Sequence, residues 1–185
     1  HNEIYIVHNG IIENHDEIRN KLKEEGYKIT SETDSELIAH LIHLNKTDSS
    51  SILEALIKAT KELKGAFSIA AISAHEKGKI YAAKQKSPLL IGKGIEENFV
   101  ASDPLAIANI TEKFYLLEDG DFAEITKNDI KIFNSNKEPI HRKETKIDAT
   151  PTSTSKGNYT HFMEKEIYEQ PDALGNTINL SLIHI

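Results

Sequence analysis

The sequence contains no cysteine and no tryptophan, and only one methionine. Without cysteine no disulfide can form and no thiol nucleophile can come from these residues, so the fold has to rest on a hydrophobic core. No apolar run approaches the ~20 residues that span a bilayer, and no secretory signal is recognisable. We therefore expect a cytoplasmic protein.

Positive charge is also in short supply. Acidic residues outnumber basic ones by 29 to 22, which gives a net charge of −7. Such a surface repels phosphate backbones and anionic lipid head groups, so we expect neither nucleic acid nor membrane as a partner. A length of 185 residues suits one domain with an extension.

Two candidate capping boxes predict helices in the first part of the chain. Asn14 with Glu17 opens a helix expected over residues 15–25, and Thr33 with Glu36 opens the next one. The second helix carries one apolar stripe, made of Leu37, Ile38, Leu41 and Ile42. A further apolar pattern predicts a third helix over residues 51–63.

Short β-type runs dominate the rest of the chain. An apolar, β-branched run at residues 4–7 predicts a first strand that is buried on both faces. Seven more strands are predicted at residues 66–72, 79–83, 89–92, 98–101, 114–117, 122–125 and 130–133. Many strands beside a block of helices predict an α+β fold built in layers.

The last part of the chain is polar before it turns helical again. Residues 142–158 are rich in serine, threonine and lysine, which predicts an irregular connector on the surface. A short helix is expected at residues 161–169. Gln170 and Pro171 should end it, because the residue before a proline avoids the helical region.

Asn9 and Gly10 directly follow the first expected strand. Glycine lets a ligand approach the backbone N–H closely because it has no Cβ, and the asparagine carboxamide offers a second donor. Two converging donors can form an oxyanion hole. Asn-Gly is also the commonest dipeptide of tight turns, and the spacing alone favours that plainer interpretation.

Asp34 lies in the first turn of the second expected helix. A carboxylate there complements the helix macrodipole, and local sequence alone favours this structural role. The functional alternative is a carboxylate that pairs with a substrate ammonium group.

His40 and His43 lie three residues apart on the same helix, a spacing that could bring two ligands to a metal. No third ligand stands at a useful spacing, so we interpret them as ordinary surface or partly buried histidines and expect no metal site. The chain also lacks the glycine-rich nucleotide-binding motifs, and we expect no cofactor.

Several segments, taken in order, resemble class II glutamine amidotransferases. Residues 7–14 (VHNGIIEN) resemble the glutamine-binding core of that family, and residues 31–36 (SETDSE) resemble the next block of the same site. Later strands match at residues 87–92, 97–103 and 117–121. Residues 161–171 (HFMEKEIYEQP) resemble the segment that leaves the glutaminase domain in the members that act on fructose 6-phosphate, and this run is the most discriminating.

The resemblance implies a four-layer αββα N-terminal-nucleophile hydrolase fold, incomplete at its N-terminus. By motif match, Asn9 and Gly10 correspond to the oxyanion hole, and Asp34 corresponds to the residue that binds the α-ammonium of glutamine. In the family, an N-terminal cysteine attacks the glutamine amide with its own α-amino group as the base. Ammonia then passes to an isomerase domain, where fructose 6-phosphate becomes glucosamine 6-phosphate.

The sequence also departs from the family pattern, and these departures suggest which parts of the domain are missing. The opening cysteine strand is missing, and so is the block with the arginine and tryptophan of the substrate pocket. We expect residues 1–142 to form a partial amidotransferase domain, residues 143–179 to connect it to an absent isomerase domain, and residues 180–185 to be a tail outside the family. The chain alone should be inactive, and its parent enzyme should be a cytoplasmic homodimer.

Two other interpretations remain open. The chain could belong to another class II amidotransferase, of the phosphoribosyl-pyrophosphate type, although residues 165–171 argue against this. It could also be a nucleophile-free domain that binds a ligand or regulates a partner. The missing first strands argue against the second alternative, because a functional binding domain should be complete.

Overall fold

The computed structural model describes residues 3–47, 49–147 and 156–183, with side chains up to residue 175. The chain divides into two compact units, His1–Asp148 and Ala149–Ile185. None of the helices in these ranges is long and apolar enough to cross a membrane.

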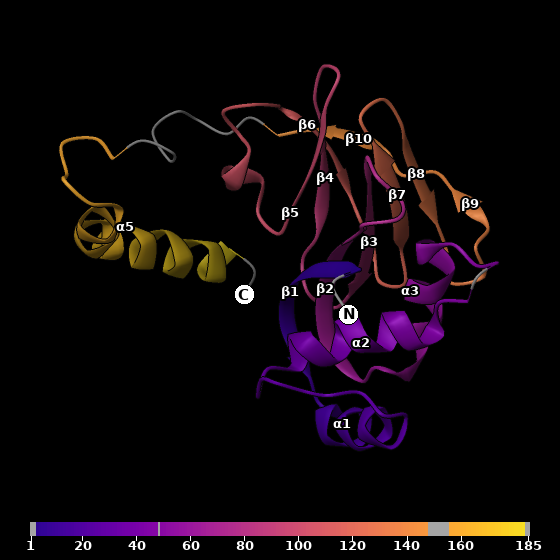
Figure 1. Ribbon diagram of the computed structural model, residues 1–185. Helices are drawn as coiled ribbons and strands as arrows, with labels where there is room; N and C mark the ends of the chain where they lie inside the picture. Colours follow the sequence, from indigo (N-terminus) through magenta and orange to yellow (C-terminus); the bar gives the residue numbers. More distant parts are fainter. Residues whose placement is uncertain (1–2, 48, 148–155, 184–185) are drawn as a thin grey trace. The chain divides into compact units, whose positions relative to one another are not determined.

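Two antiparallel sheets build the first unit (Figure 1). The larger sheet has the strand order β1 (Ile4–Ile12), β2 (Gly65–Ser73), β3 (Lys79–Gln85), β7 (Phe122–Thr126), β8 (Ile130–Phe133) and β9 (Pro139–Ile140). The smaller sheet has the order β10 (Glu144–Lys146), β6 (Lys113–Leu116), β4 (Leu90–Lys93) and β5 (Asn98–Ala101). A short 3-10 helix, Pro104–Ala106, follows β5.

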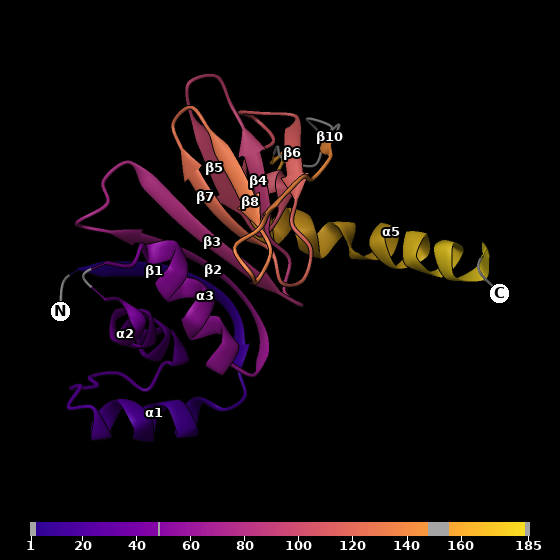
Figure 2. The ribbon, with the colours of Figure 1, turned by 90° about the vertical axis from the view of Figure 1, so that its right-hand side faces the viewer.

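Helices cover one face of the larger sheet, and the smaller sheet covers the other face at β3, β7 and β8 (Figure 2). The helices are α1 (His15–Glu24), α2 (Asp34–Asn45) and α3 (Ile52–Glu62). Their apolar stripes, including Leu41 and Leu56, pack with Ile69 of β2 into the main core. Ile91 of β4 and Ile125 of β7 pack between the two sheets. Helix, sheet and sheet are thus three layers of the predicted four, within residues 3–147.

The first strand lies at the edge of the larger sheet, where it pairs only with β2 in the part of the chain that the structure describes. Its expected burial on both faces is wrong: Val7 is 70% exposed and Tyr5 53%. The alternate residues Ile4 and Ile6 pack against the helix-side core. Successive side chains of a strand point to opposite faces, so the set that includes Ile4 and Ile6 packs under the helices and the set that includes Tyr5 and Val7 is open.

Ladder bonds fix which backbone groups of β1 face the open edge. The amide of Ala74 donates to the Glu3 carbonyl at 2.9 Å, and the amide of Glu13 donates to the Lys64 carbonyl at 2.8 Å. The register between these bonds is continuous. In an antiparallel pair, bonded and non-bonded positions alternate. The odd-numbered residues of β1 therefore bond to β2, and the even-numbered N–H groups point outward.

The two capping boxes expected at α1 and α2 do not form. The side chain of Asn14 does not cap α1. It bridges to a distant segment instead, since its Nδ2 donates to the Glu62 carbonyl at 2.9 Å and its Oδ1 accepts from the Lys64 amide at 2.8 Å. Thr33 likewise makes no side-chain cap for α2. A reciprocal box does form at α3, where the sequence analysis had not placed one.

Strand β10 and helix α5 differ from what the sequence predicted. Glu144–Lys146 pair with β6, so the expected irregular connector begins as a strand. Residues 148–155 of that connector lie outside the described residues. In the second unit, α5 (Phe162–Ile183) continues through Pro171, so its expected end at that proline is wrong.

Candidate active site

Asn9 and Gly10 lie within β1, which continues to Ile12, so the strand end expected before them is wrong. Asn9 is exposed on the face opposite the helices. Gly10 has a φ of +134°, and a Cβ at this position would collide with the backbone oxygen of Ala66 on β2. Only glycine fits both the backbone angle and the close approach of the strands. By the ladder alternation, the Gly10 N–H points to the open edge.

Asp34 is brought to the same edge by α2. It is the first residue of that helix, and its Oδ2 accepts a hydrogen bond from the backbone N–H of Ile12 at 3.0 Å. Ile12 is the next outward-facing position after Gly10, about 7 Å further along the strand. The Asp34 side chain remains 25% exposed, so its carboxylate is open to a ligand. The structure therefore places the three predicted site residues along one short stretch of β1.

His8 is a neighbour of this stretch, and its position in the sequence motif predicts no role for it. Its side chain is only 2% exposed, its Nδ1 lies 3.1 Å from the Ser35 hydroxyl, and the same nitrogen lies 3.6 Å from Asp34 Oδ1. Burial lowers the pKa of His8, and the charge of Asp34 opposes this only in part. The sequence could have predicted that His8 is buried, because side chains alternate along a strand and His8 shares the helix-facing side with Ile4 and Ile6.

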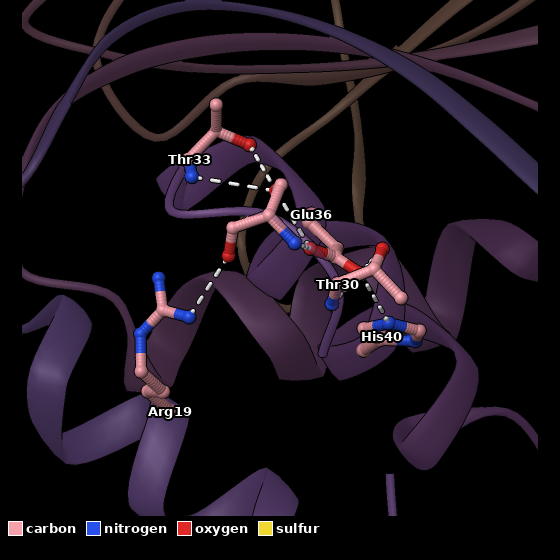
Figure 3. Close-up of polar contacts among 6 residues, drawn as sticks. Arg19, Thr30, Thr33, Glu36 and His40 are labelled. Carbon is pink, nitrogen blue, oxygen red and sulfur yellow. Dashed lines mark hydrogen bonds and ion pairs between the residues drawn. The ribbon is translucent and has the colours of Figure 1, made fainter. Parts of the chain in front are cut away.

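Glu36 holds the loop that leads into α2 (Figure 3). Its two carboxylate oxygens accept from the backbone N–H and hydroxyl groups of Thr30 and Ser31, at 2.5–2.8 Å. Burial raises the pKa of Glu36, but these hydrogen bonds outweigh burial and lower it to about 2. Arg19 of α1 reaches the same loop, donating to the Ser31 carbonyl at 3.0 Å and the Glu32 carbonyl at 3.1 Å.

The histidine pair of α2 makes protein contacts. His43 Nδ1 lies 2.6 Å from the Tyr27 hydroxyl, and His40 Nε2 lies 3.5 Å from Glu36 Oε1. The Tyr27 ring also packs against both imidazoles. Among the residues described, no three histidine, aspartate or glutamate side chains cluster in a way that could hold a metal ion.

Comparison with known proteins identifies the family of this chain. Residues 1–109 match the family described as glutamine amidotransferase domain. The glutamine–fructose-6-phosphate aminotransferase (isomerizing) of Vibrio parahaemolyticus is 46% identical over 176 residues, covering 95% of this chain and 29% of that protein. The Vibrio cholerae protein of the same name is 42% identical over 182 residues, covering 98% and 30%. The chain thus spans less than a third of the length of these relatives.

Two solved structures share the fold. Glutamine phosphoribosylpyrophosphate amidotransferase from B. subtilis, complexed with ADP and GMP, aligns with a TM-score of 0.62 and 21% identity over 71% of this chain and 29% of that chain. An allosteric regulatory enzyme of purine biosynthesis aligns with a TM-score of 0.61 and 22% identity, over 72% and 29%. This likeness confirms the predicted α+β, N-terminal-nucleophile hydrolase fold. With the family match extending over more than half of its residues, the chain belongs to the glutamine amidotransferase domain family.

Proposed function

We propose that this chain forms the glutamine-binding part of an enzyme that converts fructose 6-phosphate and glutamine to glucosamine 6-phosphate and glutamate. The observation that carries the proposal is the hydrogen bond between Asp34 and Ile12, which holds a carboxylate beside Gly10 at the open edge of β1. The names and identities of the Vibrio relatives support the choice of acceptor.

Each site residue has a defined role in this proposal. Asp34 binds the α-ammonium group of glutamine through charge-assisted hydrogen bonds. Asn9 Nδ2 and the Gly10 N–H donate to the amide oxygen as it becomes an oxyanion. These roles need no metal and no cofactor, because positioning and oxyanion stabilisation come from the protein's own donors and carboxylate.

The nucleophile comes from outside these 185 residues, which contain no cysteine. A thiol attacks the amide carbon, the C–N bond breaks, and the nitrogen takes up a proton and leaves as ammonia. Water then hydrolyses the thioester to glutamate and regenerates the thiol. The isolated chain should therefore release ammonia from glutamine no faster than buffer does.

The remaining assignments concern the longer enzyme. Residues 1–142 contribute to its glutaminase domain, residues 143–179 lead to an isomerase domain that receives the ammonia, and residues 180–185 are a tail outside the family. The enzyme works in the cytoplasm as a homodimer. Support for a further domain comes from the relatives, of which this chain spans 29% to 30%.

The phosphoribosyl-pyrophosphate amidotransferases offer a second candidate acceptor, since a solved member shares the fold with a TM-score of 0.62. Its identity of 21% is half or less of the 42% to 46% found with the fructose 6-phosphate enzymes. The acceptor proposal rests on that difference.

A chimera tests the function. In it, this chain replaces the aligned segment of the Vibrio parahaemolyticus aminotransferase, which supplies the rest of the enzyme. Asn9→Ala should lower kcat for glutamine hydrolysis roughly 10²–10³-fold with little change in KM, because a donor to the transition state is lost. Asn98→Ala is the matched control, since Asn98 donates to the Thr126 carbonyl at 2.8 Å within the sheets.

Asp34→Asn in the same chimera should act on binding. It keeps the shape but removes the charge that faces the substrate ammonium, so KM for glutamine should rise ~10-fold or more with a smaller change in kcat. An unchanged KM would mean that Asp34 only stabilises the N-terminus of α2 by complementing the helix macrodipole. Glucosamine 6-phosphate should form in step with glutamate. Glutamate release without it would point to a different acceptor.

A further inference from the structure

We propose that Glu36 is a positioning residue for Asp34: it fixes the loop of residues 30–33 and so holds the ammonium-binding carboxylate at the edge of β1. This inference rests on the proposed role of Asp34 in binding glutamine. It adds a residue that does not itself touch the substrate.

The first support is the density of hydrogen bonds on Glu36. The backbone N–H and the hydroxyl of Thr30 both donate to Oε1 at 2.8 Å. The same two groups of Ser31 donate to Oε2, at 2.5 Å and 2.6 Å. Four donors of two consecutive residues thus converge on one carboxylate, which fixes the backbone of the loop as well as its side chains.

The second support is that the loop is also held from the opposite side. Arg19 of α1 donates to the carbonyl oxygens of Ser31 and Glu32. Figure 3 shows Arg19 and Glu36 reaching the loop from different helices. The Glu36 carboxylate thus holds the N–H groups of the loop, and the Arg19 guanidinium holds its carbonyl groups. Together they leave the loop little freedom to shift.

The third support is what Glu36 does not do. Glu36 occupies the third position of α2, where the glutamate of a capping box reaches back to the N-cap residue, Thr33. Instead it reaches further back, beyond Thr33, to Thr30 and Ser31. Asp34 is the first helical residue, so the path of this loop decides where its carboxylate lies.

Holding the loop has a direct consequence for binding. The Asp34 carboxylate meets the Ile12 N–H at 3.0 Å while remaining open to solvent. A site fixed in this geometry before the ligand arrives avoids the entropic cost of ordering it on binding. A mobile loop would spread the carboxylate over many positions, and glutamine would bind more weakly without any loss in the chemical step.

Glu36→Gln in the chimera tests this inference. Glutamine keeps the size of the side chain, but its amide NH₂ replaces one acceptor and faces the donors of either Thr30 or Ser31. We expect KM for glutamine to rise roughly 5- to 20-fold while kcat stays within about 2-fold, as expected when binding is lost uniformly. When Asp34→Asn is already present, adding Glu36→Gln should raise KM little further, because Glu36 acts on binding only through Asp34.

Glu54→Gln is the matched control. Glu54 is the capping glutamate of α3 and accepts from the Ser51 amide at 3.1 Å, on a helix that does not carry a proposed site residue. Its loss should leave KM for glutamine unchanged. Equal effects of the two substitutions on KM would show a general loss of stability and would overturn the positioning role.

Two further outcomes separate this inference from the proposed function. If Asp34→Asn raises KM but Glu36→Gln does not, the positioning role fails alone. If Asp34→Asn has no effect, the assignment of Asp34 itself fails. Hydrogen exchange on the isolated chain adds an independent test: the Thr30 and Ser31 amides should exchange at least ~10-fold faster in Glu36→Gln, and unchanged exchange would overturn the proposal.

Discussion

Helices α2 and α3 begin with similar sequences and reach different structures. At α3, Ser51 and Glu54 form a reciprocal capping box, in which each side chain bonds the backbone of the other residue. At α2, Thr33 and Glu36 have the same spacing, yet Thr33 makes no cap and Glu36 bonds the loop before it. The box stabilises one helix end, whereas the α2 arrangement fixes a loop and the carboxylate that follows it.

The difference follows from the donors that each glutamate can reach. The loop before α2 offers four N–H and O–H donors within reach of Glu36, and Arg19 holds that loop in place. Proteins depart from local rules mainly at functional sites. The start of α2 is such a departure, and it carries Asp34, one of the three proposed site residues.

The largest expected difference between the two helix starts appears in acid. Hydrogen bonds from neutral groups outweigh burial and lower the pKa of Glu36 from 4.5 to about 2. A hydrogen bond from Lys137 is the main cause of the lowered pKa of Glu54. A carboxyl whose pKa is lower in the folded state contributes stability that is present above pH 4.5 and lost as the pH falls toward the folded value.

Salt should separate these two contributions. In about 0.5 M salt the Debye length is only a few Å, so the exposed Lys137–Glu54 pair is screened while the neutral donors of Glu36 are not. Urea unfolding of the whole chain between pH 5 and 2.5 measures this as a loss of stability in acid. Glu36→Gln should flatten that loss equally at low and high salt, whereas Glu54→Gln should flatten it less at high salt, where only the Ser51 amide bond remains. A salt-sensitive effect at Glu36 would contradict the cause given for its pKa.

The next largest difference concerns the cap residues themselves. Ser51→Ala should lower the free energy of unfolding by about 1 kcal/mol, because the Ser51 hydroxyl accepts from the Glu54 amide. Thr33→Ala should cost no more than a few tenths, since Thr33 makes no cap bond. Urea midpoints at neutral pH, with unchanged slopes, give both values. Equal losses would mean that Thr33 caps α2 in solution.

The sequence predicted most of the secondary structure, because periodicity and turn residues are local signals. Where these predictions were wrong, the structure depends on contacts with residues far away in the sequence. Asn14 had the right type and position for a cap, but the segment at Glu62 and Lys64 takes its side chain. The burial of β1 depended on its place at the sheet edge, which no local pattern specifies.

For the site, motif resemblance supplied Asn9, Gly10 and Asp34, and their roles remain predictions. Glu36 and His8 lie in the segments that resemble the family, but the resemblance assigned them no role, because their contacts reach across 5 to 27 positions of the chain. The capping-box spacing predicted that Glu36 caps α2, because that spacing describes only the helix to which Glu36 belongs and not the loop before it.

The smallest expected effect lies near neutral pH, again at the start of α2 and not at α3. Two influences compete at His8: burial lowers its pKa below 6.5, and the charge of Asp34 raises it. Because burial is the larger, His8 should be neutral in the folded chain. Its contribution to stability should be complete above pH 6.5 and decline as the pH falls from 6.5 through the folded pKa, since the unfolded chain then binds more protons.

Urea unfolding at several pH values between about 5 and 7.5 measures this slope. His8→Asn, whose amide group can take the position of Nδ1 beside the Ser35 hydroxyl, should make the slope shallower. His75→Asn is the control, because the same substitution is made at a side chain that is 70% exposed. The sign of the slope decides between the two influences on His8. If the Asp34 carboxylate dominated, protonation would stabilise the fold, and the His8 contribution would grow as the pH fell. That result would make the pair an ion pair in the resting site, with the Asp34 charge already neutralised before an ammonium group arrives, and Asp34 would be a poor candidate for binding glutamine.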